Sequence, residues 1–384
     1  MTPVIVLASC LLAALLSPGI VRAADDPTPD QLSKLVKLLG DDSFRTRERA
    51  YRELLSVGLP ARNALTRGLR SPDLEIRVRA RRLLSQVLED EFEGRLAAFI
   101  ADVQGTKEHD LPGWKRYRDS VGTRRMARTL YVSMIREEIP LLQALDSGRQ
   151  LDQLFAERVK GLQPYSYGNG PRTAPAASLA TLLFLCTQPE LSIELTTHQQ
   201  IFSLLQYTGT MNTIKGSPYR ALFYGMLDGW VRKLDTDLPN AYYPLMTTLN
   251  YDMKKTGYDL AKKHLAAPTT SSSIQQYAIM AIARFGSDKD IDLLTPHLQN
   301  STVCHTWNNP QIKKGVIRTQ VRDVALVMML ELTGQNQQEY GFTLLKRNTT
   351  TVFHGYTCGF VDESNRDKAL QMWKTWYSKR RESE

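Results

Sequence analysis

The segment FRTRERAYRELL at residues 44–55 aligns without gaps to the segment LEIRVRARRLLS at residues 74–85. Phe44 aligns with Leu74, and the identical pairs include Arg47 and Arg77, Arg49 and Arg79, Ala50 and Ala80, and Leu54 and Leu84. Self-similarity at a fixed offset, here 30 residues, is typical of proteins that stack one supersecondary unit on the next. This repeat decides the predicted fold.

Each copy of the repeat predicts a helix that begins after a polar cap. Asp42-Ser43 precedes the first copy and Ser71-Pro72-Asp73 precedes the second. Between the copies, Gly58-Leu59-Pro60 predicts a turn, and a second helix follows whose apolar stripe consists of Ala61, Ala64, Leu65 and Leu69. A helical hairpin of this size cannot bury its apolar face alone, so we expect each hairpin to stack on the next.

The succession of Asp-x-x-x-Arg-x-x-Ala, paired leucines, a Gly-Pro turn and an Ala/Leu helix resembles the HEAT-like repeat. The pattern returns at residues 274–286, with residues 288–298 as a partner helix, and at residues 321–326. The chain thus resembles exported bacterial proteins with PBS-lyase/HEAT-like repeats, most clearly over residues 30–90 and 272–334. This resemblance implies an all-α, armadillo-type fold, a right-handed superhelical solenoid of helical hairpins.

Helical periodicity continues between the clear repeats in weaker form. Residues 89–104 extend the helix that begins after Asp73, and further helices are predicted near residues 124–145, 179–186, 198–207, 219–234, 241–249 and 257–265. Residues 161–176 contain three Gly and three Pro and predict a loop or linker. We therefore expect N-terminal HEAT-like repeats at residues 24–160, and degenerate and then clear repeats at residues 177–334.

The C-terminal part of the chain departs from the repeat pattern. Residues 302–307, a turn at Asn308-Asn309-Pro310, and residues 316–319 predict a small β-hairpin near residues 303–318, inserted between repeat helices. Residues 335–384 are expected to form a helical cap. There, Trp373 and Trp376 are three residues apart, so they lie on one side of a helix and shield the last apolar face.

Residues 1–23 are predicted to be a signal peptide. Residues 4–16 are almost wholly apolar, Ser17-Pro18-Gly19 ends the run, and Val21-Arg22-Ala23 places small residues at the cleavage spacing. The run is shorter than the roughly 20 residues that span a bilayer, and no later window is apolar for long enough. We expect an exported protein, periplasmic or secreted, without a transmembrane segment after the signal peptide.

The composition of the 384 residues, 42% hydrophobic and 23% charged, excludes wholesale disorder and a mostly membrane-embedded chain. The net charge of +9 permits an anionic partner without requiring one. The sequence contains no Gly-x-Ser-x-Gly, His-Glu-x-x-His, Walker or EF-hand pattern. It therefore predicts no catalytic residue, no metal ligand and no cofactor.

Residues 110–136 contain seven Lys and Arg residues against two Asp residues and are the strongest candidate for binding an anion. The candidate anion-binding residues are Lys115, Arg116, Arg118, Arg124, Arg125 and Arg128. Pro112, Gly113 and Gly122 predict a loop between helices within this window, and Trp114 and Tyr117 either stack on sugar rings or are buried under the loop. The repeat arginines also suggest a basic ridge, although pairing with neighbouring acidic residues is the favoured interpretation.

Cys304 and Cys358 are candidates for a disulfide in an oxidising compartment, and two free thiols are the alternative. Together with His305 and His354 they resemble a Cys2His2 zinc set. However, neighbouring residues of a strand point to opposite faces, so Cys304 and His305 cannot both bind one ion if residues 303–307 form a strand. A zinc site is therefore not the favoured interpretation.

We expect a non-catalytic binding or scaffolding protein of the bacterial cell envelope that uses the solenoid surface to bind a protein partner. One alternative is an enzyme or enzyme accessory, since some HEAT-like proteins resemble phycobilin lyases. A second is a binder of an anionic envelope polymer, either a glycan or a lipid head group, through the basic segment. Nucleic acid is not expected as a partner because the protein is exported.

Overall fold

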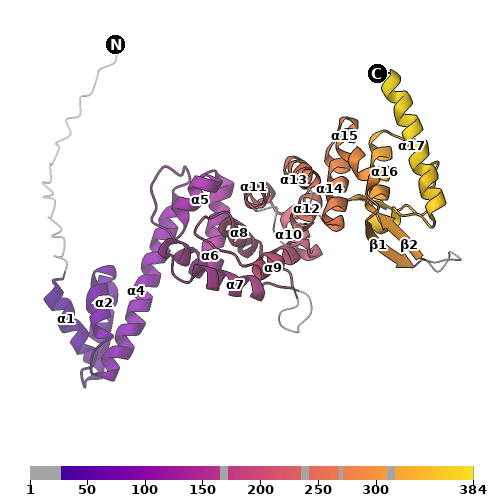
Figure 1. The fold of residues 1–384 in the computed structure, drawn as a ribbon. Coiled ribbons are helices and arrows are strands. Elements are labelled where there is room, and N and C mark those ends of the chain that lie inside the picture. Colours follow the sequence, from indigo (N-terminus) through magenta and orange to yellow (C-terminus); the bar gives the residue numbers. More distant parts are fainter. Residues whose placement is uncertain (1–26, 165–171, 235–241, 268–270, 309–315, 384) are drawn as a thin grey trace, which may run out of the picture. The chain divides into compact units, whose positions relative to one another are not determined.

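The computed structural model describes residues 27–164, 172–234, 242–267, 271–308 and 316–383. Within them it contains 17 α-helices and two short antiparallel strand pairs, so the fold is all-α with a small β insertion, as predicted (Figure 1). None of these helices is both long and apolar enough to cross a membrane. The predicted signal peptide, part of the predicted linker (residues 165–171) and the hairpin tip (residues 309–315) lie outside the described residues.

The chain divides into two compact units, residues 1–98 and residues 99–384, which we call the N-terminal and C-terminal units. The described part of the N-terminal unit consists of α1 (Pro29–Leu38), α2 (Phe44–Val57), a 3-10 turn (Leu59–Ala61), α3 (Arg62–Gly68) and most of α4 (Leu74–Ala101). Its buried core is formed by Leu32, Val36, Leu39, Ala50, Leu54, Ala61, Ala64, Leu65, Ala80, Leu83 and Val87.

The two aligned segments form the starts of α2 and α4, and their matched arginines make the same contact. Nη1 of Arg47 donates to the carbonyl oxygens of Asp41 (2.7 Å) and Asp42 (3.0 Å). Thirty residues later, Nη1 of Arg77 donates to the carbonyl oxygens of Ser71 (2.8 Å) and Pro72 (2.8 Å). Each arginine therefore satisfies the carbonyl groups of the loop that precedes its own helix.

Ion pairs connect α2 to α4 in the N-terminal unit. Arg79 lies 2.8 Å from Glu48 and 2.6 Å from Glu75, and Arg47 lies 3.6 Å from Glu75. The favoured interpretation of the repeat arginines, pairing with acidic residues of the neighbouring hairpin, is confirmed for these two residues.

The first half of the C-terminal unit is a succession of helices. They are α5 (Trp114–Val121), α6 (Arg125–Ser147), α7 (Leu151–Gly161), α8 (Ala176–Cys186), α9 (Leu195–Gln206), α10 (Thr208–Gly216), α11 (Arg220–Val231), α12 (Tyr242–Asn250) and α13 (Lys254–Ala266). The sequence does not predict α7 and α10, which are short.

The predicted loop at residues 112–122 is wrong. Helix α5 occupies this window, because Trp114 and Tyr117 are three residues apart and are buried on one face of a helix.

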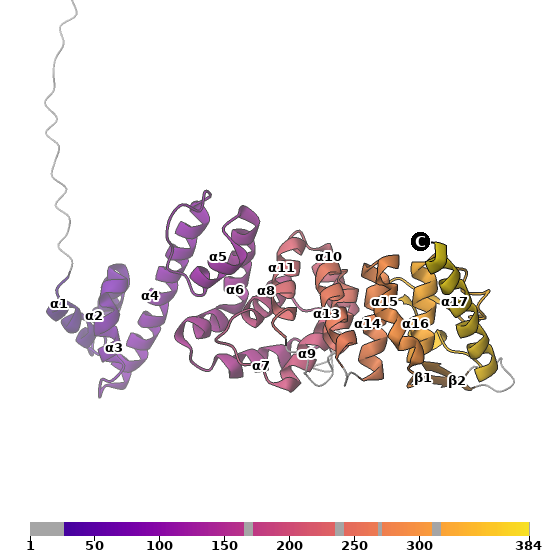
Figure 2. The same cartoon turned by 45° about the horizontal axis from the view of Figure 1, so that its top comes forward.

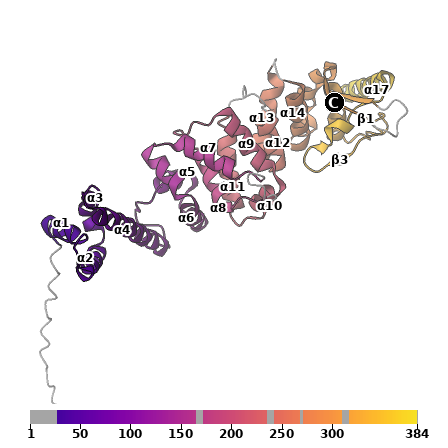
Figure 3. The same ribbon diagram turned by 90° about the horizontal axis from the view of Figure 1, so that it is seen from below.

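The second half of the C-terminal unit contains the strands. Its elements are α14 (Ser272–Phe285), α15 (Ile291–Leu294) between 3-10 turns at Asp288–Asp290 and Thr295–Gln299, β1 (Val303–Asn308), β2 (Val316–Gln320), α16 (Val321–Leu332), β3 (Arg347–Asn348), β4 (Val352–Phe353), a turn at Gly355–Thr357, and α17 (Glu363–Ser383). β1 and β2 pair antiparallel with Trp307 opposite Ile317, which confirms the predicted β-hairpin. Figure 3 shows β3 at the same end of this unit as β1.

One predicted helix of this half, residues 288–298, is wrong as a continuous element. The structure breaks it into a 3-10 turn, the four-residue α15 and a second 3-10 turn. The break follows Leu294, because Pro296 has no N–H for a helical hydrogen bond and disfavours the α conformation of the residue before it.

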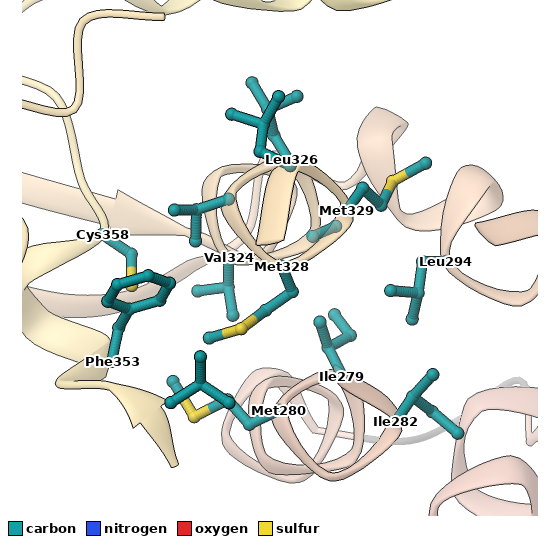
Figure 4. Close-up of a cluster of buried hydrophobic side chains, with 14 of the residues drawn as sticks. Ile279, Met280, Ile282, Leu294, Val324, Leu326, Met328, Met329, Phe353 and Cys358 are labelled. Carbon is teal, nitrogen blue, oxygen red and sulfur yellow. The ribbon is translucent and has the colours of Figure 1, made fainter. Parts of the chain in front are cut away.

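Helix α16 lies at the centre of the largest hydrophobic core. Val324, Leu326, Met328 and Met329 of α16 belong to one buried cluster with Ile279, Met280 and Ile282 of α14 and with Leu294, Phe353 and Cys358. Met328 points toward α14, whereas Leu326 lies on the opposite side of α16 (Figure 4). α17 lies on α16 as well (Figure 2). On it, Trp373 is 2% exposed and its ring centroid lies 5.2 Å from that of Trp376, so the two tryptophans share one side of the helix, as predicted.

A buried ion pair joins α16 to α17. Nε of Arg366 lies 2.7 Å from Oδ1 of Asp323, and the two residues are 2% and 1% exposed. Asp323 also accepts a hydrogen bond from the Gln320 N–H at the start of α16, and Arg366 donates to the carbonyl oxygen of Arg318. Removing one partner leaves the other charge buried, which is costly because a charge in a low-dielectric interior has lost its hydration.

We therefore predict that Arg366→Leu lowers the free energy of unfolding of the C-terminal unit by about 3–5 kcal/mol. In the double variant with Asp323→Asn the loss is smaller than the sum of the single losses, because no ionised side chain remains unpaired. Urea unfolding followed by tryptophan fluorescence measures this unit, since all five tryptophans lie within it. Lys255→Leu, at an exposed ion pair with Asp259, is the matched control and costs at most about 1 kcal/mol. Strictly additive losses would contradict this prediction.

Candidate functional site

The structure separates the six candidate anion-binding residues into three groups: exposed residues, residues paired with a carboxylate, and one buried residue. Lys115, Arg124 and Arg125 are exposed. Arg116 forms an ion pair with Glu190, and Arg118 lies 2.7 Å from Glu108. These two arginines are thus already engaged with carboxylates.

Arg128, the sixth candidate, is only 6% exposed and has a structural contact. Its Nη2 donates to the carbonyl oxygens of Phe99 (2.6 Å) and Asp102 (2.9 Å), where α4 ends. Its guanidinium lies 3.9 Å from the centre of the Phe99 ring. A cation at the end of a helix is favourable because the last carbonyl groups have no helical partner and carry partial negative charge. Arg128 therefore terminates α4.

The carboxylate of Asp102 lies beside Arg128 and forms several polar contacts. It lies 2.9 Å from Nε2 of His109, accepts hydrogen bonds from the N–H groups of Lys107 (3.1 Å) and Thr106 (3.2 Å), and lies 3.7 Å from Nη2 of Arg128. The His109 contact first, and then the N–H groups and Arg128, hold the pKa of Asp102 well below its usual range. The carboxylate is ionised at neutral pH and fixes the loop after α4.

Trp114 and Tyr117 are buried, and Trp114 lies next to Arg128. The rings of Trp114, Tyr131 and Phe99 lie within 5.5 Å of one another by their centroids, and the hydroxyl of Tyr117 donates to the carbonyl oxygen of Ala127. Burial raises the pKa of the Tyr117 hydroxyl. The sequence left open whether Trp114 and Tyr117 stack on sugar rings or are buried, and in the structure both are buried.

A groove lies between the end of α4 and α6, on the surface that contains Arg125. We call it the α4–α6 groove. Its volume is about 280 Å³ and it is lined by Phe99, Ile100, Val103, Arg125, Arg128, Thr129 and Val132. Val103 is 68% exposed and Ile100 is 47% exposed. Nη1 of Arg128 is buried and has no hydrogen-bond partner among the described residues. The groove thus combines exposed apolar surface with a guanidinium that is partly unpaired.

Sequence reasoning missed Ile100 and Val103. The signal was present: Leu96 and Phe99 are three residues apart and supply the core side of α4, so Ile100 and Val103 are apolar residues beyond the stripe that the core needs. The adjacent arginines were selected from the sequence by their charge alone.

The two cysteines and two histidines that resemble a zinc set do not converge on one point. The thiol of Cys304 donates to the carbonyl oxygen of Thr319 (3.3 Å), whereas His305 lines a separate cavity with His354. Among the described residues, no group of three or more Cys, His, Asp or Glu side chains is arranged to hold a metal ion.

The two candidate disulfide residues are free thiols in this structure. Burial raises the pKa of Cys304 to about 12 and that of Cys358 well above its ordinary value, and the proximity of the two sulfurs raises the pKa of Cys358 further. Both are therefore protonated at neutral pH.

Comparison of the chain with models of known protein families gives no match, and comparison with curated proteins gives none either.

We predict that Arg128→Met lowers the free energy of unfolding of the C-terminal unit by about 2–4 kcal/mol, because it removes a charged donor from two buried carbonyl groups. Arg125→Met, an identical change on the same helix at an exposed position, changes it by at most about 0.5 kcal/mol. Urea unfolding followed by tryptophan fluorescence compares the two. Equal effects would show that Arg128 is a surface cation and does not terminate α4.

Proposed function

We propose that the chain is a non-catalytic binding protein of the bacterial cell envelope, built as a HEAT-like solenoid, and that the α4–α6 groove binds a segment of a protein partner. The observation that carries the proposal is the groove itself, in which exposed Ile100 and Val103 lie beside the buried guanidinium of Arg128. An exposed apolar surface with a polar rim is typical of protein interaction sites.

The matched contacts of Arg47 and Arg77 support the HEAT-like part of the proposal, because two aligned segments form equivalent helix starts. Further along the chain, contacts between successive helices such as α13 with α14 and α14 with α16 are those expected of stacked hairpins. The proposed location in the cell envelope follows from the predicted signal peptide at residues 1–23.

The chemistry of the groove specifies the partner segment. Apolar side chains of the partner would cover Ile100 and Val103. Arg125 at the rim adds a positive charge that favours an acidic residue next to the apolar anchor. The partner is therefore a protein segment in which apolar residues adjoin Asp or Glu.

A photo-crosslinking residue at position 103 of the full chain tests this proposal in envelope extract. We expect a defined protein adduct from position 103 and none from position 361, where Val361 is exposed on another surface. An unspecific set of adducts equal at both positions would count against the groove. Retention on heparin that is lost in the Lys115→Ala, Arg124→Ala, Arg125→Ala variant, without an adduct, would favour the anionic polymer instead.

We predict that Val103→Glu weakens binding of the captured partner at least tenfold, because it places a carboxylate where the partner's apolar and acidic groups would lie. Since Val103 is largely exposed, the melting temperature should stay within a few degrees of the parent value. Binding is measured by titration of the purified partner. Val361→Glu is the matched control and leaves affinity unchanged.

A further inference from the structure

A second cavity lies at the opposite half of the C-terminal unit, where α14, β1 and the segment from β3 to the turn at Gly355–Thr357 meet. Its volume is about 270 Å³. Its lining includes the polar and aromatic residues Gln276, Tyr277, His305, Asn348, His354 and Tyr356. We call this space the hairpin cavity. It is independent of the α4–α6 groove and of the function proposed for that groove.

Gln276 forms the inner wall of the hairpin cavity. It is 2% exposed, and its Oε1 is buried without a hydrogen-bond partner among the described residues. Gly355 faces its amide so closely that a Cβ atom at residue 355 would lie 2.6 Å from Nε2 of Gln276. A buried acceptor without a partner costs about 1–3 kcal/mol, so natural structures rarely keep one without a role. Gln276 therefore leaves an unsatisfied hydrogen-bond acceptor in the wall of the cavity.

The segment from β3 to His354 supplies a donor. Oδ1 of Asn348 accepts hydrogen bonds from the N–H groups of Thr350 (2.8 Å) and Thr351 (2.9 Å), which fixes the loop. Nδ2 of Asn348 lies 3.3 Å from Nδ1 of His354. Because an amide nitrogen can only donate, Nδ1 of His354 accepts and the ring proton is on Nε2. His354 thus keeps one N–H donor free of this contact.

His305 adds a third polar group, and the cavity as a whole is uncharged. Nε2 of His305 is buried without a partner in the described part of the chain, and burial lowers the pKa of the ring, so it is neutral at pH 7. No Asp, Glu, Lys or Arg is among the described residues that line the cavity. A charged ligand would therefore be desolvated here without a counter-ion, which is unfavourable.

Aromatic rings form the outer part of the cavity. Tyr356 is 37% exposed, and its ring is held by Trp307 edge-on at 5.4 Å and by His354 at 5.6 Å. Tyr277 lines the same space from α14. A rigid aromatic face beside fixed amide and imidazole groups suits a ligand that has one apolar face and several hydroxyl groups, each of which both donates and accepts.

We propose that the hairpin cavity binds one ring of a neutral carbohydrate, with its hydroxyl groups on Gln276, His305 and His354 and its C–H face on Tyr356. The volume is slightly below the usual range of ligand pockets, about 300–1,000 Å³, so a single sugar ring fits and a larger organic molecule does not. Neutrality of the lining distinguishes this site from a site for an anionic glycan.

The test titrates the full chain with methyl glucoside, methyl galactoside and N-acetylglucosamine, and with glucuronate and glucosamine as charged counterparts, by calorimetry and saturation-transfer NMR. We expect at least one neutral sugar to bind, and charged sugars to bind at least tenfold more weakly. Failure of every neutral sugar to bind the folded protein would overturn the proposal and indicate a cavity filled by water. Binding of N-methylacetamide in place of the sugars would overturn it in favour of an amide ligand.

Substitutions then assign the binding to this cavity. Gln276→Met keeps the size of the side chain and removes the acceptor, so we expect at least tenfold weaker sugar binding with little change in melting temperature, because the unpaired buried oxygen is also removed. Tyr356→Ala, at an exposed ring, should weaken binding similarly. Gln338→Met, the same change at an exposed position outside the cavity, is the matched control. Unchanged affinity in both cavity variants would overturn the proposal.

Discussion

The C-terminal half of the molecule depends on covering one helix from every side. Nine of the twelve residues of α16 are buried, and they include eight apolar residues in a nearly continuous run. A helix that is apolar all round cannot leave any face in water, so α14, the 3-10 turn at 295–299, β2 and α17 all contact it. The one charged residue among the nine, Asp323, then requires a buried counter-ion, and Arg366 supplies it from α17. The position of the last helix follows from this pair as much as from apolar contacts.

The packing of several segments around α16 also brings together the segments that line the hairpin cavity. The chain after β4 lies so close to β2 that a Cβ atom at Gly359 would be 2.9 Å from the backbone nitrogen of Thr319, which is a distance real side chains do not allow. This approach brings the turn at Gly355–Thr357 against the strand pair. Val352 has a φ of 67°, an unfavourable value for a β-branched residue. Its burial in the core and the two hydrogen bonds that Asn348 accepts from this loop offset the strain. The polar cavity is thus built at the junction of covering segments, where helix packing leaves amide and imidazole groups.

The sequence predicted the parts of the fold that local patterns determine. The aligned arginines and leucines of residues 44–55 and 74–85 predicted α2 and α4, and the segments 302–307 and 316–319 on either side of a turn predicted the β-hairpin, because each signal lies within a short stretch of chain. It did not predict α5, since Gly113 and Gly122 indicate chain breaks equally well at the ends of a short helix and within a loop. It also could not show that Arg128 points inward while Arg125 points outward, because both are basic residues of α6. The difference arises from the end of α4, about 25 residues earlier in the chain, whose carbonyl oxygens accept hydrogen bonds from Arg128. Of the polar cavity, the sequence grouped only His305 and His354, as part of a zinc-like set, because Gln276 and Asn348 come from other segments.

The use of arginine in this chain explains why its positive charge is a weak guide to its ligands. Arg47, Arg77, Arg128 and Arg366 each donate to backbone carbonyl groups of a loop, a helix end or a strand. The guanidinium group suits this role because it has several donors in a fixed plane and stays charged when partly buried. An arginine whose N–H groups are occupied by carbonyl oxygens, and for Arg47 and Arg366 also by a carboxylate, has few donors left for a ligand. The net charge implies a basic surface for an anionic ligand, and neither proposed binding surface is of that kind. The α4–α6 groove is apolar with a single guanidinium in reach, and the hairpin cavity is neutral.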